Sequence, residues 1–101
     1  MAGPKRFVYI ITSTVKAATY YVGVTSDVSS RLAAHNAGLN VHTARDRPWR
    51  VLVVVEFDEE APARKFESYL KTGSGREFAR RHFRRTVSGR SVRDRTAGGR
   101  V

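Results

Sequence analysis

The chain has 101 residues, 41% of them hydrophobic, which suits one globular domain and leaves no room for a second domain of ordinary size. It contains no cysteine, which excludes disulfide bonds, thiolate metal sites and a cysteine nucleophile. Nineteen Lys and Arg against nine Asp and Glu give a formal net charge of +10, and such an excess in a small domain favours a nucleic-acid partner over simple solvation.

No apolar run reaches the roughly 18 residues that a membrane span requires. The longest apolar blocks, at residues 7–11 and 51–55, are also too short for the core of a signal peptide. We therefore expect a cytoplasmic protein with neither a membrane nor a disulfide-bonded partner. Its charge would associate it with the nucleoid if its partner is DNA.

Three segments have the β-branched and aromatic content of strands, at residues 6–12, 19–25 and 50–57. The short polar link between the first two predicts an antiparallel hairpin. Apolar residues occupy consecutive rather than alternate positions in these segments, so both faces of the sheet must be covered. The sequence therefore predicts an α/β domain, with a small sheet between helices.

Three helices are predicted to provide that cover. The first spans about residues 27–37, between a run of capping residues and a glycine. The second spans about 61–71, with a proline in its first turn and an apolar stripe along one side. The third spans about 76–85, and the spacing of Ser74 and Glu77 predicts a capping box at its start.

The end of the chain differs in composition from the rest. From Val87 onward it is rich in Gly, Ser and Arg and has no hydrophobic periodicity. Such a segment cannot bury enough apolar surface to fold. We therefore expect a folded domain at residues 1–86 and a disordered basic tail at 87–101.

The order of several residues along these elements resembles the GIY-YIG nuclease family. The matching positions are Val8-Tyr9-Ile10, Tyr21-Val22-Gly23, Arg31, His35 and Glu67. Within that family the chain is most similar to small stand-alone bacterial proteins related to the nuclease domain of the incision subunit of nucleotide-excision repair. The resemblance covers residues 5 to about 85 and implies a three-stranded antiparallel sheet flanked by helices.

The resemblance also implies an activity. It implies an endonuclease that hydrolyses phosphodiester bonds of structured or damaged DNA in repair or recombination, with one Mg²⁺ or Mn²⁺ per site. Glu67 would hold the metal and Arg31 would bind the phosphate. Tyr9 would activate water with help from Tyr21, and His35 would lie beside the scissile phosphate.

The residue types suit these roles. A phenol has a pKa of about 10, so Tyr9 serves as a base only where nearby positive charge favours the phenolate. Arg31 and His35 are four residues apart and share a helix face, where a guanidinium can bridge two phosphate oxygens. Glu67 borders an apolar stripe, where a lone carboxylate needs a cation, and Mg²⁺ binds through one or two carboxylates and several waters.

Each of these residues also has an ordinary interpretation. The two tyrosines fit a cross-strand aromatic pair, and Arg31 with His35 fits a solvated polar stripe. Glu67 fits a surface ion pair with Lys71, four residues along the helix.

Basic residues in the last third of the domain are predicted to contact DNA. Arg76 stands near a helix N-terminus, where backbone N–H groups favour phosphate. Gly23 is expected to leave room for the substrate next to Tyr21. The predicted DNA-binding residues are Gly23, Lys71, Arg76, Arg80, Arg81, Arg84 and Arg85.

Two departures from the family pattern support an alternative function. The first triplet is Val-Tyr-Ile rather than Gly-Ile-Tyr, and no Asn follows Glu67, where many family members have one. The alternative is a non-catalytic DNA- or RNA-binding module that keeps the fold. A third, weaker interpretation is a basic ribosome-associated protein.

Overall fold

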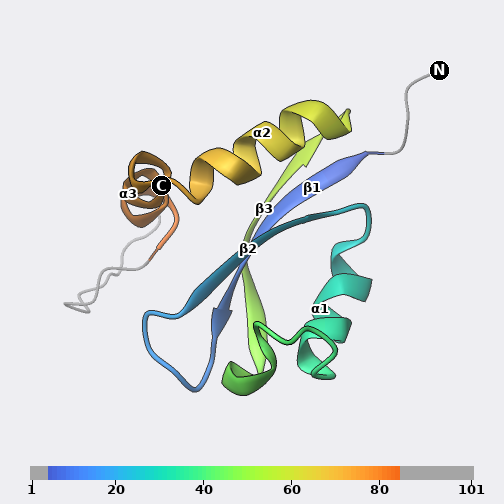
Figure 1. Cartoon of the computed structure of the whole chain (residues 1–101), viewed down its shortest axis with the longest axis vertical. Coiled ribbons are helices and arrows are strands. Elements are labelled where there is room, and N and C mark those ends of the chain that lie inside the picture. The colour runs from blue at the N-terminus through green and yellow to red at the C-terminus, as the bar shows by residue number, and fades with distance from the viewer. Residues whose placement is uncertain (1–4, 85–101) are drawn as a thin grey trace, which may run out of the picture.

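The computed structural model describes residues 5–84, so the tail expected at 87–101 lies outside the described residues. Within these residues, three strands and three α-helices follow one another along the chain, and Figure 1 shows their arrangement. They are β1 (Arg6–Ser13), β2 (Tyr20–Thr25), α1 (Val28–Asn36), β3 (Trp49–Phe57), α2 (Glu60–Leu70) and α3 (Gly73–His82), with a 3-10 helix, η1 (Ala44–Asp46), before β3.

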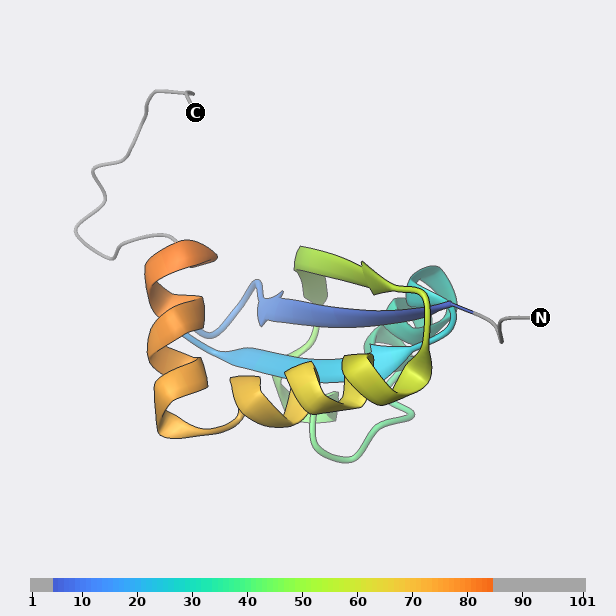
Figure 2. The same ribbon diagram turned by 90° about the horizontal axis from the view of Figure 1, so that it is seen from above.

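The strands form one antiparallel sheet in the order β2-β1-β3. Helix α1 covers one face, and α2 and α3 cover the other (Figures 1 and 2). The expected three-stranded sheet with helices on both faces is therefore confirmed. A bulge in the β1–β3 ladder lies between Ile10 and Ile11, so the side chains of β3 change face along its length.

The two faces of the sheet have different cores. The face under α2 and α3 has a hydrophobic cluster of buried side chains, namely Val8, Ile10, Ala63, Leu70 and Ala79. We call this set the apolar core.

The face under α1 buries Tyr9, Ile11 and Trp49, and the fully buried polar residues His35 and Thr43 lie in α1 and in the loop that follows it. These five residues are called the polar core below.

Local capping fixes the helix starts. The Asp27 carboxylate accepts a hydrogen bond from the Ser30 N–H at the start of α1, and Gly38 follows the helix with a φ of 80°, as its sequence position predicted. The predicted capping box of α3 is wrong. The hydroxyl of Thr72 caps this helix by accepting from the Gly75 N–H, so α3 begins three residues earlier than expected.

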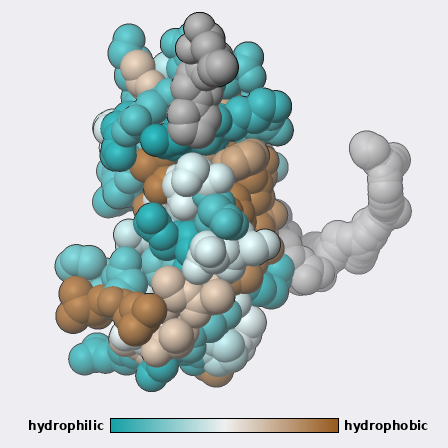
Figure 3. Space-filling view, turned by 90° about the vertical axis from the view of Figure 1, so that its right-hand side faces the viewer, coloured by the Kyte–Doolittle hydropathy of each residue, from teal (hydrophilic) through white to brown (hydrophobic). Residues whose placement is uncertain are grey.

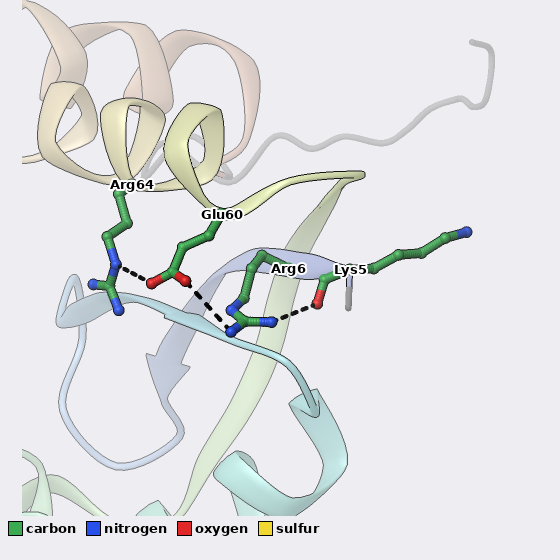
Figure 4. A network of polar contacts seen from close by, with 4 residues as sticks. All are labelled: Lys5, Arg6, Glu60 and Arg64. Atoms are coloured by element: carbon green, nitrogen blue, oxygen red, sulfur yellow. Dashed lines mark hydrogen bonds and ion pairs between the residues drawn. The ribbon is translucent and has the colours of Figure 1, made fainter. Parts of the chain in front are cut away.

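A polar network ties the start of β1 to the start of α2 (Figure 4). The Glu60 carboxylate accepts from Arg64 at 2.7 Å and from Arg6 at 3.5 Å. These residues are exposed or half-buried and lie at the end of α2 away from Lys71. Glu60 and Arg64 can therefore be replaced as controls for substitutions at the other end of α2.

The face drawn in Figure 3 is hydrophilic at its upper end, has apolar areas on both sides of its middle, and has an apolar lobe that protrudes at its lower end. The loop after α1 lies at that end of the molecule in Figure 1, and its Leu39 and Val41 are 78% and 83% exposed. Because these apolar side chains are exposed, the loop is held by polar contacts, such as the hydrogen bond from the Thr43 N–H to the Asn40 carbonyl.

None of the helices within residues 5–84 has the length and apolar content needed to cross a bilayer.

Candidate active site

Tyr9 extends from the centre of the sheet across its neighbouring strand. It pairs with Gly23 of β2, and a methyl group added to Gly23 would overlap the Tyr9 hydroxyl and lie 2.6 Å from Cζ. Only glycine leaves space for this ring, so Gly23 is the reason that Tyr9 reaches the β2 side of the sheet. The room that was expected to admit substrate at Gly23 is filled by Tyr9, and Gly23 is buried.

His35 lies directly behind the Tyr9 hydroxyl. Its ring is fully buried, with Nε2 2.9 Å from Tyr9 Oη and Nδ1 2.7 Å from Thr43 Oγ1. The Thr43 Oγ1 also lies 3.5 Å from the Asn40 carbonyl oxygen, at the outer limit of a hydrogen bond. In the tautomer with the proton on Nδ1, His35 donates to Thr43 and its Nε2 accepts from the Tyr9 hydroxyl. His35 thus lies behind Tyr9 rather than at an exposed position beside a phosphate.

The residues that hold His35 were not identified from the sequence. The Thr43 carbonyl accepts from the indole N–H of Trp49 at 2.8 Å. The Asn36 amide accepts from the Trp49 N–H at 2.6 Å and donates to the Trp49 carbonyl at 3.0 Å. These contacts join α1, the loop after it and β3 around the imidazole. A threonine in a loop carries no sequence signal for such a role.

Tyr21 completes a cluster of three rings. Its ring centroid lies 6.4 Å from that of Tyr9 and 4.9 Å from that of His35, edge-on to the imidazole. Tyr9 and Tyr21 therefore do pack together as a cross-strand aromatic pair, as the ordinary interpretation expected. The additional imidazole makes the cluster polar at its centre.

Arg31 and Glu67 act on this cluster through their charges. Arg31 is exposed on α1, one turn before His35. Burial raises the pKa of Tyr9 to about 12; Tyr21 and Glu67 act in the same direction, and Arg31 opposes them. Burial, followed by the positive charge of Arg31, lowers the pKa of His35. At neutral pH the pair is thus a protonated phenol hydrogen-bonded to a neutral imidazole.

The carboxylate of Glu67 already has a cation. It accepts from Lys71 Nζ at 2.8 Å, with 17% of the Glu67 side chain and 50% of the Lys71 side chain exposed. The predicted surface pair is therefore present, although Glu67 is mostly buried and acts on Tyr9 electrostatically. Its position at the edge of the cluster fits one carboxylate ligand to an ion that keeps most of its waters.

Within residues 5–84, no group of three or more His, Asp or Glu side chains could hold a metal ion. This finding disfavours a closed site built from protein ligands alone, such as a structural zinc site. A hard cation held by Glu67, water and a phosphate oxygen needs no such group.

The basic residues predicted to contact DNA fall into two sets. Lys71, Arg76 and Arg84 line a common hollow beside β2. Arg80 and Arg81 lie on the exposed side of α3, where both contact the Glu77 carboxylate, at 2.6 Å and 3.3 Å. Arg85 lies outside the described residues.

Comparisons with known proteins show the family to which the chain belongs. The sequence profile of the GIY-YIG catalytic domain matches residues 5–82. Structure-specific endonuclease subunit SLX1 of Chaetomium globosum is 42% identical over 66 residues, covering 59% of this chain and 20% of that protein. The UPF0213 protein YsiG of Lactococcus lactis is 36% identical over 66 residues, covering 64% of this chain and 62% of that protein.

A solution structure of a UPF0213 protein from Bacillus halodurans is similar with a TM-score of 0.44 and 27% identity, covering 73% of this chain and 80% of the other. The present chain spans about a fifth of the length of the SLX1 protein and less than two thirds of YsiG.

Proposed function

The chain belongs to the GIY-YIG family, and we propose that it is a divalent-metal-dependent endonuclease that hydrolyses DNA phosphodiester bonds. One observation carries the proposal. The Tyr9 hydroxyl passes over Gly23 to form a hydrogen bond with a buried, neutral His35, and it lies within the electrostatic reach of both Arg31 and Glu67. A buried structural tyrosine also needs a hydrogen-bond partner, but it needs neither a partner that can take up its proton nor the two opposite charges.

The proposed proton path runs from water to Tyr9 and from Tyr9 to His35. With its pKa at about 12, Tyr9 is a poor base in the free protein unless its own proton has a destination. His35 Nε2, 2.9 Å away, is that destination, because the lowered pKa of His35 keeps the ring neutral and able to accept. Thr43 holds the other side of the imidazole and so orients it.

The remaining roles follow from exposure and charge. Arg31 is exposed and positively charged beside the Tyr9 hydroxyl, where it would meet the phosphate and stabilise the charge that develops on it. Glu67 would hold Mg²⁺ or Mn²⁺, which supplies a hard positive charge to a phosphate oxygen. Lys71 would then leave Glu67 for the DNA backbone.

The biological setting is proposed on the relatives' names and the family resemblance. SLX1 is named a structure-specific endonuclease subunit, which supports a branched or otherwise structured DNA as substrate. We propose a role in DNA repair or recombination on the same ground. The relation to the nuclease domain of the excision-repair incision subunit is proposed from sequence resemblance alone. The basic residues of α3 are proposed to contact the DNA backbone.

The alternative, a non-catalytic DNA- or RNA-binding module, is favoured by one contact. Lys71 occupies the carboxylate that the enzyme would need for its metal. A module that has lost catalysis would keep this ion pair when DNA is bound.

The test is the substitution Glu67→Gln, assayed for cleavage of duplex, branched and single-stranded DNA with Mg²⁺ or Mn²⁺. We expect cleavage to fall at least about 100-fold, because the amide keeps the shape but not the charge that holds the ion. Affinity for DNA should stay the same or rise, since a negative charge near the backbone is removed.

Glu60→Gln is the matched control, because Glu60 lies on the same helix and also pairs with a basic side chain four residues along. It should cleave like the wild type. Cleavage retained by the Glu67 variant would place the metal elsewhere, and a wild type that binds but never cleaves would establish the non-catalytic alternative.

A further inference from the structure

A hollow of about 260 Å³ lies between β2 and the corner where α2 meets α3. Among the described residues, its walls combine two tyrosines, two aliphatic residues and three basic residues, and none of these lining residues is acidic. The size is just below the range of about 300–1,000 Å³ that is usual for small-ligand sites. The hollow therefore has room for one small molecular unit with an apolar part and a negative charge.

The hollow borders the candidate active site through two shared residues. Tyr21 lines it and also packs on His35, and Lys71 lines it and also binds the Glu67 carboxylate. A unit bound in the hollow and the group held at Tyr9 would thus be neighbours on one chain.

The positive charge of the residues that line the hollow favours an anionic ligand. Within residues 5–84, Arg76 and Arg84 form no ion pair, in contrast to Arg80 and Arg81, which share Glu77. Lys71 is the third cation of the lining. A phosphate group entering here would meet these cations without competing with a carboxylate of the lining.

Arg84 also provides a surface for stacking. Its Cζ lies 4.2 Å from the centroid of the Tyr20 ring. Its Nε is buried and has no hydrogen-bond partner among the described residues, so the guanidinium is held by the ring rather than by a polar contact. Unpaired bases commonly stack on aromatic rings and on guanidinium planes.

We propose that this hollow binds one unpaired nucleotide of DNA, and that this nucleotide lies next to the cleaved bond on the same strand. The phosphate lies between Lys71 and Arg76, and the base stacks on the layer formed by Arg84 and Tyr20. A base within a duplex cannot enter, because both of its faces are already stacked. The hollow thereby directs the protein to the junction between paired and unpaired DNA. The identity of the polymer as DNA rests on the proposed function.

The experiment measures equilibrium binding of the full chain by fluorescence anisotropy in EDTA, so that cleavage plays no part. Three labelled DNAs of equal charge are compared: a duplex hairpin, a duplex that ends in three unpaired nucleotides, and the same DNA with those three positions abasic. The wild type should bind the unpaired nucleotides about tenfold more tightly than either of the other two.

Arg84→Lys is the informative variant, because it keeps the charge and removes the plane. It should bind all three DNAs with the affinity that the wild type shows for the hairpin. Arg64→Lys makes the same change on the far end of α2, outside the hollow, and should keep the tenfold preference.

Three results would overturn the proposal: equal wild-type affinity for the three DNAs, an Arg84→Lys variant that keeps the preference, or a loss that affects the hairpin equally. The last result would mean that the hollow contacts the phosphates of any DNA and does not recognise an unpaired base. Because binding is measured without metal, a protein that prefers unpaired nucleotides but never cleaves would refute the nuclease proposal and leave this one standing.

Discussion

The two faces of β1 use neighbouring residues of one strand for different purposes. Val8 and Ile10 point into the apolar core under α2 and α3, whereas Tyr9 and Ile11 point into the polar core under α1. Both sets are at most 1% exposed. Burial alone therefore does not distinguish a residue that holds the fold from one that is set up for chemistry. The distinction lies in whether a buried polar atom is directed at another one, as Tyr9 Oη is directed at His35 Nε2.

The strongest way to sharpen this comparison is Tyr9→Phe, which removes one oxygen from the polar core. Cleavage should fall by about 10²–10⁴-fold, the usual contribution of a positioned proton acceptor. The free energy of unfolding should fall by only about 1–3 kcal/mol, because His35 Nε2 is left without its donor. Single-turnover cleavage and urea unfolding measure the two effects. Unchanged cleavage would return Tyr9 to the role of a packing residue.

The adjacent substitution Ile10→Ala should do the opposite. It leaves a cavity in the apolar core and should lower the free energy of unfolding by about 2–5 kcal/mol. Cleavage per folded molecule should not change, since Ile10 contacts no polar group of the site. The measurement is cleavage at a temperature where the variant is folded, corrected for the folded fraction. A large loss of activity in the folded variant would show that the two faces are coupled.

Gly23→Ala would test the comparison by displacing Tyr9 while leaving all of its atoms in place. The added methyl group must displace the Tyr9 ring, and a displacement of about 1 Å in a catalytic group can reduce the rate about 100-fold. Gly73→Ala is the control, because nothing lies within 4 Å of its added methyl group. Cleavage by the Gly73 variant should equal that of the wild type. Equal activity of the two variants would mean that Tyr9 is not held by the glycine.

The smallest effect concerns the pH dependence of stability. Because the pKa of His35 is lowered in the folded protein, the unfolded chain takes up a proton first as the pH falls below about 6.5. Stability is then lost between pH 6.5 and the folded pKa, by at most about 1.4 kcal/mol per pH unit.

The control for this prediction is His35→Gln, whose melting temperature should depend less on pH between 7.5 and 5. The carboxylates with lowered pKa values, Glu60 and Glu77, titrate below this window. Parallel curves for wild type and variant would contradict the assignment of a neutral His35.

The sequence predicted the elements and the sheet well, because local signals decide them. The strands at 6–12 and 50–57 lack alternation, which indicated two covered faces. The predicted start of α3 was wrong because both Thr72 and Ser74 have side chains that can cap a helix. Only the packing at the α2–α3 corner decides which of them does so. At that corner a Cβ on Gly75 would overlap the Tyr69 carbonyl, so only glycine fits at this position of α3.

The candidate site was less accessible to sequence reasoning. Resemblance supplied Tyr9, Arg31 and Glu67, but residue types alone left ordinary interpretations open for each. The burial of His35 and its bond to Thr43 depend on how a loop folds back on α1, which no local pattern encodes. The same holds for Gly23, whose closest neighbour is a side chain from another strand.

The two hydrogen bonds between Asn36 and the backbone of Trp49 fasten both ends of the loop at residues 37–48. The free-energy cost of closing such a loop rises slowly with its length, by about 0.6 kcal/mol for each doubling. Its tip carries the exposed Leu39 and Val41, which support nothing in either core. Added chain at the tip would therefore cost the domain little, and the scaffold can carry a longer recognition loop beside the same chemistry without being rebuilt.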